Sequence, residues 1–260
     1  MADFRCLCPY SLETTRLSPN TDYYVRAYAT NITGTAYGEE FNFTTKPIVN
    51  DAIFNADLTY GTVTDIEGNE YKTILIGTQT WMVENLKTTK FNDGTQIPFA
   101  SNATEWITTD VEAPSYCWYD DNISNKDTYG ALYKWYAVTD WRKICPTGWH
   151  VPTDAEWTIL TTFLGGESVA GGKLKETGTT HWLEPNTGAP NETGFTALPG
   201  GYRSNDNGIF FGMGSFNHYW SSEMSDGYLW AAGVYYATPY FDIGYTSGAH
   251  GFSVRCLRDN

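Results

Sequence analysis

Hydrophobic and polar residues alternate along the first part of the chain, from about residue 11 to residue 46. Successive side chains of an extended segment point to opposite faces, so this alternation predicts β-strands. One predicted face carries Tyr24, Arg26, Tyr28 and Thr30, and the other carries Tyr23, Val25, Ala27 and Ala29. We expect a turn at residues 31–34 and a second strand at residues 40–44.

The pattern changes after Ala56. Residues 61–71 are typical of a strand, a glycine turn and a second strand, and residues 72–76 and 80–83 are further strand candidates separated by Gly77. Two helices are predicted, at residues 128–138 and at residues 154–164. The second has Thr153 as a possible cap and Glu156 three residues later. Glycine is frequent from Gly165 onward and strong helix signals are absent there, so the whole pattern favours an α+β domain.

Composition and charge narrow the function. The formal net charge is -14, and no run of basic residues offers contacts to phosphates, so nucleic-acid binding is not expected. No apolar run reaches the roughly 18 residues of a membrane helix. The first residues lack the apolar core of a signal peptide, so we expect a chain cut from a longer protein or one exported by another route. Aromatic residues make up 16% of the chain, and tyrosine and tryptophan are common anchors of binding sites.

Five cysteines are scattered along the chain, at positions 6, 8, 117, 145 and 256. None forms a Cys-x-x-Cys pair, so a zinc site is not expected. The cysteines favour buried thiols or a single disulfide.

The N-terminal segment resembles part of a fibronectin type III module. Residues 17–23, Leu-Ser-Pro-Asn-Thr-Asp-Tyr, are similar to the tyrosine corner of these modules, and residues 43–47 are similar to their last strand. A complete module needs roughly 100 residues, and fewer than fifty are present here. We predict a partial fibronectin type III-like segment over residues 1–47 and a linker over residues 48–55.

The rest of the chain carries long, ordered motifs. They are Asp-Ile-Glu-Gly-Asn at 65–69, Ile-Gly-Thr-Gln-Thr-Trp-Met-Val-Glu-Asn-Leu at 76–86, Tyr-Gly-Ala-Leu-Tyr at 129–133, Cys-Pro-Thr-Gly-Trp-His-Val-Pro-Thr-Asp-Ala-Glu-Trp at 145–157, and Gly-Phe-Ser-Val-Arg-Cys at 251–256. Together they resemble the Fibrobacter succinogenes major paralogous domain over roughly residues 60–259.

That family is similar to the formylglycine-generating-enzyme branch of the C-type lectin fold. The resemblance implies an α+β domain over residues 56–260, with two main helices, short antiparallel strands, paired first and last strands, and a ligand surface on its loops. The enzyme of that branch needs two neighbouring reactive cysteines near its C-terminus, whereas Cys256 stands alone there. We therefore expect a non-enzymatic protein without a cofactor.

Two sequence features resemble parts of calcium sites, but neither is sufficient to predict calcium binding. Glu184-Pro185-Asn186 copies the tripeptide of mannose-type lectins, but the Trp-Asn-Asp strand that should follow is missing. Residues 120–127 form an oxygen-rich loop that lacks the glycine of an EF-hand, so a solvated turn is preferred. No metal site is predicted.

The last sixty residues, 201–260, have an unusual composition. Lys, Gln and Glu occur there once, at Glu223, although their twenty occurrences in the 150 residues 51–200 would predict eight. Tyrosine, serine, glycine, asparagine and aspartate fill the stretch, the mixture that antibody paratopes use. The stretch also resembles the variable region of diversity-generating retroelement target proteins, in which fixed residues separate variable ones.

The expected fixed frame comprises residues 201–203, 213–214, 219–222, 230 and 251–256. Within it, Trp220 and Trp230 are expected in the core, and Arg203 and Arg255 are expected to pair with buried carboxylates or carbonyls. The predicted ligand contacts between them are Ser204, Asp206, Phe211, Phe216, Tyr228, Leu229, Tyr235, Tyr240, Asp242, Tyr245, Thr246 and His250. Ile209, Ser215, Ala237 and Ile243 are further candidate variable positions.

The sequence thus predicts a ligand- or receptor-binding protein with diversified contact residues, displayed outside the cell on a bacterial surface or a phage tail. Its partner would be a protein or glycan on a cell surface. The alternative is an adhesion or carbohydrate-binding module without programmed variation.

Overall fold

The computed structural model describes residues 22–44, 52–108, 112–225 and 228–259. The chain divides into two compact units, Met1–Val49 and Asn50–Asn260. Most of the predicted tyrosine-corner segment, residues 48–51 of the predicted linker, Cys6 and Cys8 lie outside the described residues.

The described part of the first unit is a β-hairpin. Strands β1 (Asp22–Asn31) and β2 (Gly34–Thr44) pair antiparallel, which confirms the predicted turn between them. The Asn31 side chain closes this turn, because its Oδ1 accepts hydrogen bonds from the backbone N–H and the hydroxyl of Thr33. Aromatic side chains pair across the strands, with Tyr23 5.9 Å from Phe43 between ring centroids.

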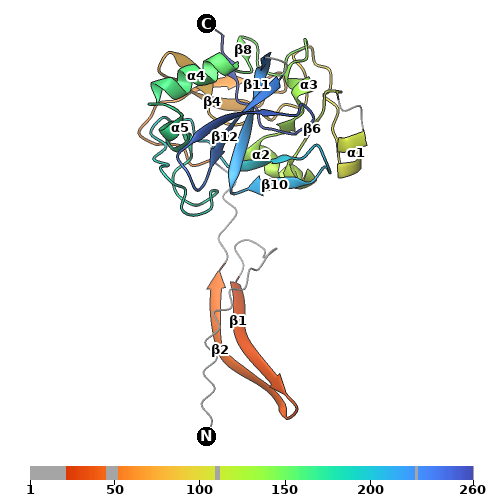
Figure 1. Cartoon of the computed structure of the whole chain (residues 1–260), viewed down its shortest axis with the longest axis vertical. Helices are drawn as coiled ribbons and strands as arrows, with labels where there is room; N and C mark the ends of the chain where they lie inside the picture. The colour runs from red at the N-terminus through yellow and green to blue at the C-terminus, as the bar shows by residue number, and fades with distance from the viewer. Residues whose placement is uncertain (1–21, 45–51, 109–111, 226–227, 260) are drawn as a thin grey trace. The chain divides into compact units, whose positions relative to one another are not determined.

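The second unit contains two five-stranded sheets and a two-stranded sheet (Figure 1). The first sheet has the order β3-β4-β5-β14-β8, with bounds Gly61–Thr64, Glu70–Ile76, Gln79–Met82, Leu257–Arg258 and Trp149–His150. The C-terminal sheet has the order β10-β9-β11-β12-β13, with bounds Phe210–Met213, Gly200–Arg203, Phe216–Ser225, Tyr228–Tyr235 and Phe241–Thr246. The small sheet pairs β6 (Tyr116–Cys117) with β7 (Leu132–Tyr133).

The last strand closes the first sheet. Leu257 of β14 lies opposite Trp81 of β5 on one side and His150 of β8 on the other. The last strand thus pairs with β5 and β8, and the first strand, β3, lies at the edge of the sheet beside β4, so the implied pairing of first and last strands is wrong. A disulfide with an S–S distance of 2.02 Å joins Cys256, directly before β14, to Cys145, which precedes β8 in the chain.

The helices of the second unit are short. The described α-helices are α1 (Ala103–Thr108), α2 (Lys126–Tyr129), α3 (Trp135–Val138), α4 (Asp154–Phe163) and α5 (Glu167–Leu174), and two single 3₁₀ turns cover Tyr119–Asp121 and Ile123–Asn125. The longest of them, α4, has 10 residues. The predicted α+β, C-type lectin-like fold with two main helices is therefore wrong: the unit is rich in curled antiparallel sheet with five short α-helices among its described residues.

The predicted helix at residues 128–138 is also wrong. Gly130 has a φ of 72° and ends α2. A Cβ at this position would lie 2.8 Å from the backbone oxygen of Leu86, so the chain passes too close to its neighbour for a helix to continue. Beyond the glycine, Leu132 and Tyr133 join β7. Tertiary contacts override the helical spacing here.

The other predicted helix is confirmed as α4. Thr153 Oγ1 accepts a hydrogen bond from the Glu156 backbone N–H, and the Glu156 carboxylate accepts one from the Thr153 N–H, which completes the predicted capping box. The following helix, α5, was not predicted. Its Gly171 and Gly172 lower helix propensity, but they let the helix approach other backbone closely, since a Cβ at Gly171 would lie 1.9 Å from the Tyr240 oxygen.

Two buried arginines tie the sheets to the loops. Arg255 donates to the side-chain oxygen of Asn85 and to the backbone oxygens of Met82, Phe195 and Thr196. Arg203 donates to the Asp121 carboxylate at 2.8 Å, and to the backbone oxygens of Ala100 and Gly208. These hydrogen bonds confirm the prediction that Arg203 and Arg255 pair with carboxylates or carbonyls.

Hydrophobic clusters lie on both sides of β11. Tyr219 belongs to the cluster that α4 and α5 cover, and Trp220 belongs to the cluster around Phe252 and the disulfide. Figure 1 shows β11 and β12 crossing the middle of the unit, with α4 and α5 to one side. The predicted core position of Trp220 is confirmed, whereas Trp230 is only partly buried.

A candidate ligand-binding surface on the C-terminal sheet

The edge of the C-terminal sheet is covered on one face only. On β12, Ala232 and Val234 point into the cluster under α4 and α5 and are buried. Gly233, between them, points to the opposite face. Its neighbour on β13 is Asp242, which is exposed. The face that carries Gly233 and Asp242 is therefore open to solvent.

An open groove of about 240 Å³ lies on this face. Gly233 and Gly244 contribute only backbone to its floor. A Cβ at Gly244 would meet no atom within 4 Å, so the space above it belongs to the groove. A Cβ at Gly233 would lie 2.9 Å from the Tyr235 hydroxyl, so the absence of a side chain there makes room for this ring. The other lining residues are His218, Ala231, Tyr235, Asp242, Ile243, Tyr245, Thr246 and Phe252.

A cluster of aromatic rings extends the groove toward β9 and β10. The His218 ring lies 5.0 Å from Phe252 and 5.1 Å from Phe216, measured between centroids. Tyr202 connects these rings to Phe211, at 5.6 Å, and to His250, at 5.5 Å. We call this set of rings, together with Tyr235, the aromatic cluster. Its stacked and edge-to-face pairs hold the rings in fixed positions.

The predicted contact residues fall into three groups. Tyr235, Asp242, Tyr245 and Thr246 line the groove. Phe211, Phe216 and His250 belong to the adjoining aromatic cluster. The remaining five, which lie outside both, are Ser204, Asp206, Tyr228, Leu229 and Tyr240. The structure thus brings seven of the twelve into one continuous surface.

The other five positions are dispersed. Tyr228 is exposed and stacks on Tyr245 with centroids 5.0 Å apart, and strand alternation places it on the face of Ala232, opposite Gly233. Leu229 pairs with Thr246 and is partly buried, and Tyr240 is exposed in the turn between β12 and β13. Asp206 is exposed, but Ser204 is only 5% exposed and its hydroxyl accepts from the Asp206 N–H. Ser204 therefore shapes a turn.

Strand alternation predicts that about half of the tyrosines at positions 235, 236, 240 and 245 are exposed. Tyr240 and Tyr245 are exposed, and Tyr235 and Tyr236 are partly buried, so this prediction is confirmed. The sequence interpretation missed His218, Phe252, Tyr202 and the two glycines of the floor. Gly233 and Gly244 lie on different strands, so only the pairing register brings them together.

Burial controls the electrostatics of the groove. Desolvation, aided by the nearby His250, lowers the pKa of His218 to about 4. Desolvation likewise lowers the pKa of His250 and raises the pKa of Tyr235. At neutral pH these rings are therefore uncharged, and Asp242 supplies the carboxylate at the edge. The surface is equipped to stack on a ring and to exchange hydrogen bonds.

Thiol chemistry has little support in the described residues. Cys145 and Cys256 are joined in the disulfide, and Cys117 is buried. Burial raises the pKa of the Cys117 thiol to about 12, so it remains protonated at neutral pH. The described residues contain no cluster of three or more His, Cys, Asp or Glu side chains placed to hold a metal ion.

A family model, the Fibrobacter succinogenes major domain, matches residues 74–258. The chain belongs to this family. The match begins within β4, so it leaves out β3, and it includes every residue of the groove and of the aromatic cluster. A search of curated proteins and a search of solved structures returned no match.

The motifs that suggested the family have structural roles in this Fibrobacter major domain. Residues 145–157 contain one half of the disulfide, strand β8 and the capped start of α4. Within this motif, His150 lies between the carboxylates of Asp259 and Glu156, with ring nitrogens 2.6 and 2.9 Å from their oxygens. No helix in the described part of the domain is long and apolar enough to cross a membrane.

Proposed function

We propose that this Fibrobacter major domain is a non-enzymatic binding module whose ligand occupies the groove and the aromatic cluster. The observation that carries the proposal is the convergence of four predicted contacts, Tyr235, Asp242, Tyr245 and Thr246, on one groove with a glycine floor. Rigid rings give contact area at a low entropic cost, because their positions are set before the ligand arrives.

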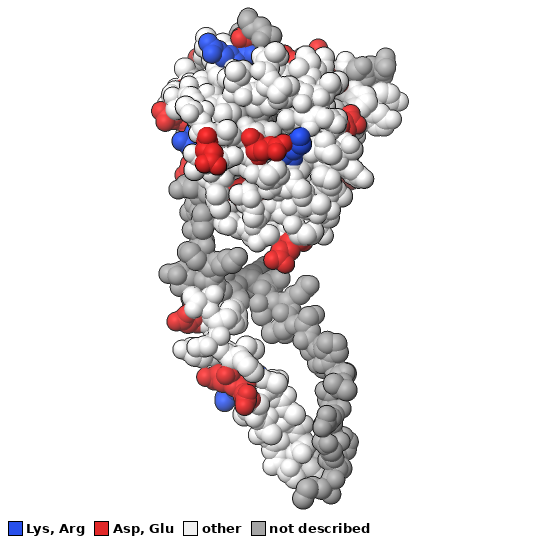
Figure 2. Space-filling view, turned by 90° about the vertical axis from the view of Figure 1, so that its left-hand side faces the viewer, with Lys and Arg blue, Asp and Glu red and all other residues white. Residues whose placement is uncertain are grey.

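The ligand class we propose is a protein or glycan on a cell surface, and the location is extracellular, on a bacterial surface or a phage tail. The flat aromatic rings and the Asp242 carboxylate suit the apolar face and the hydroxyl groups of a sugar. On the face shown in Figure 2, acidic and basic side chains are scattered among uncharged ones. With a net charge of -14, the chain is unsuited to nucleic acid.

We further propose that the contact residues are diversified by a retroelement. In support, eleven of the sixteen expected fixed residues are buried, including all of those at 219–221 and 251–256. Among the candidate variable positions, by contrast, Ser204 is the only buried one. Substitutions at exposed positions usually change the free energy of unfolding by less than about 0.5 kcal/mol, so such a surface tolerates variation.

Binding is tested by filling the groove. Gly244→Trp places an indole in the open space, and Ile159→Trp, on the exposed side of α4, is the matched control. The probes are a glycan array and a panel of intact bacterial cells. We expect Gly244→Trp to abolish binding that the control retains. Unchanged binding by a folded Gly244→Trp protein would refute the assignment of the groove.

Diversification is tested separately, by sequencing around the gene. We expect a reverse transcriptase and a near-identical copy of the segment that encodes residues 201–259. If both are missing, the domain is an adhesion or carbohydrate-binding module with a constant surface, and the binding proposal stands.

A further inference from the structure

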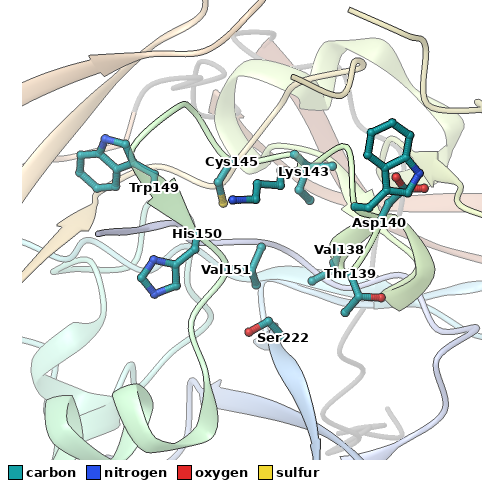
Figure 3. A pocket seen from close by; sticks show the side chains of 11 residues that line it. Val138, Thr139, Asp140, Lys143, Cys145, Trp149, His150, Val151 and Ser222 are labelled. Carbon is teal, nitrogen blue, oxygen red and sulfur yellow. The ribbon is translucent and has the colours of Figure 1, made fainter. Parts of the chain in front are cut away.

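A second pocket, away from the groove, lies beside the disulfide. It has a volume of about 270 Å³ and is formed by the segment from Val138 to Val151 together with Ser222 of β11 (Figure 3). Its walls are mainly apolar, with Val138, Ile144 and Trp149 among them. Sites for small ligands usually have this composition, a mostly apolar hollow with a few polar groups.

An exposed indole stands at the edge of this pocket. Trp141 is 83% exposed, although tryptophans elsewhere in the domain, such as Trp81 and Trp220, are fully buried. Trp149 lines the same pocket and is 9% exposed. Leaving an indole in water is unfavourable by the hydrophobic effect, and a ring that stacks on Trp141 would cover it.

The one uncommitted charge of the pocket is positive. Asp140 is occupied by Arg142, whose guanidinium donates to both carboxylate oxygens at 2.8 and 2.7 Å. His150 is held between two carboxylates. Lys143 forms no ion pair with any residue that the structure describes, and Figure 3 shows its side chain extended toward Cys145.

Lys143 also has an unusual backbone conformation. Its φ is 59°, which a lysine adopts only when the surrounding structure imposes it. Two hydrogen bonds from Asn92 impose it here, one from its N–H to the Lys143 oxygen and one from its Nδ2 to the Cys145 oxygen. With the disulfide behind Cys145, these bonds hold the loop in place, so the pocket is preorganised.

Two hydroxyl groups supply hydrogen-bond acceptors. Thr139 Oγ1 donates to the Trp135 oxygen at 3.2 Å, and Ser222 Oγ donates to the Pro152 oxygen at 3.3 Å. Each hydroxyl has thereby used its proton and keeps lone pairs for a ligand. The pocket thus presents a cation, hydroxyl acceptors and an aromatic face.

We propose that this pocket binds an acidic sugar, a pyranose ring that carries a carboxylate. The apolar face of the ring would stack on Trp141, its hydroxyl groups would donate to Thr139 and Ser222, and its carboxylate would pair with Lys143. An aromatic carboxylate would leave both hydroxyl acceptors without donors, so it fits less well. This site lies outside the candidate variable positions and binds independently of the groove.

The test uses the full chain with D-glucuronate and D-glucose as matched probes, followed through the indole N–H resonances in ¹⁵N spectra. We expect a saturable shift of the Trp141 signal, with glucuronate binding about fivefold tighter than glucose, the gain expected from an exposed ion pair. Lys143→Asn removes the charge and suits the positive φ, so the fold survives and the preference for glucuronate disappears. Trp141→Ala, followed through the Trp149 indole signal, weakens the binding of both sugars about tenfold, by loss of stacking.

Phe163→Ala, on the exposed side of α4, should leave both affinities unchanged. No saturable shift with either sugar, equal affinities for the two, or a shift confined to Trp230 would overturn the proposal. Gly244→Trp, which fills the groove, should leave glucuronate binding intact, so failure at one site is distinguishable from failure at the other.

Discussion

The Nε2 atom of His218 lies 3.2 Å from the hydroxyl oxygen of Tyr235, across the pairing of β11 with β12. The other ring nitrogen of His218, Nδ1, is buried and has no hydrogen-bond partner among the described residues. Protonation would therefore bury an N–H without an acceptor, in agreement with the lowered pKa. The groove thus depends on a histidine that must stay neutral.

Acid should destabilise the domain through His218. Its pKa is about 4 in the folded state and about 6.5 in an unfolded chain, so the unfolded state binds more protons between these values. Stability is complete above pH 6.5 and falls as the pH drops toward 4. In His218→Phe this loss should be smaller. Urea unfolding at pH 7.5 and pH 4.5 measures it, and an equal loss in both proteins would contradict the assignment.

Removing the disulfide should destabilise the second unit strongly. The bond closes a loop with a sequence separation of 111, so it restricts the unfolded chain considerably. We expect Cys145→Ala with Cys256→Ala to lower the free energy of unfolding by about 2–4 kcal/mol. Urea unfolding with and without reductant checks this. Reductant should lower the stability of the natural protein to that of the double variant, and it should not affect the variant itself.

Arg255 should be essential for stability. Its guanidinium satisfies three backbone oxygens and the Asn85 side chain in the interior. Arg255→Leu leaves these acceptors unpaired and should cost about 3–5 kcal/mol. Arg258→Leu, at an exposed position nearby, should change stability by less than about 0.5 kcal/mol. Thermal or urea unfolding measures the stability of both variants. Similar losses of stability in the two would be inconsistent with this role of Arg255.

Gly171→Ala should destabilise α5, although alanine is the better helix former. In an exposed helix the exchange gains up to about 1 kcal/mol. Here the new Cβ would lie 1.9 Å from the Tyr240 oxygen, so α5 must move away from β13. We expect a net loss of about 1–3 kcal/mol, against a small gain for Ser168→Ala at an exposed position of the same helix. If Gly171→Ala raised the free energy of unfolding instead, this prediction would be wrong.

Local sequence signals were sufficient where a residue's neighbours in sequence determine its structure. Thr153 and Glu156 are three residues apart and form their capping box within one turn, so α4 was predictable. The end of α2 at Gly130 and the helix α5 were not predicted, because Gly130 and Gly171 pack against Leu86 and Tyr240, which are distant in sequence. The groove required the register that places Gly233 opposite Asp242, and alternation within a single strand does not contain it.

The placement of β14 between β5 and β8 has a consequence for protein synthesis. The first sheet lacks the strand between β5 and β8 until the ribosome has added Leu257 and Arg258. A frameshift or premature stop anywhere in the preceding sixty codons therefore removes the strand that joins β8 to β5 and leaves the first sheet incomplete. Formation of the complete sheet therefore requires a message that is read in frame through the codon for Arg258.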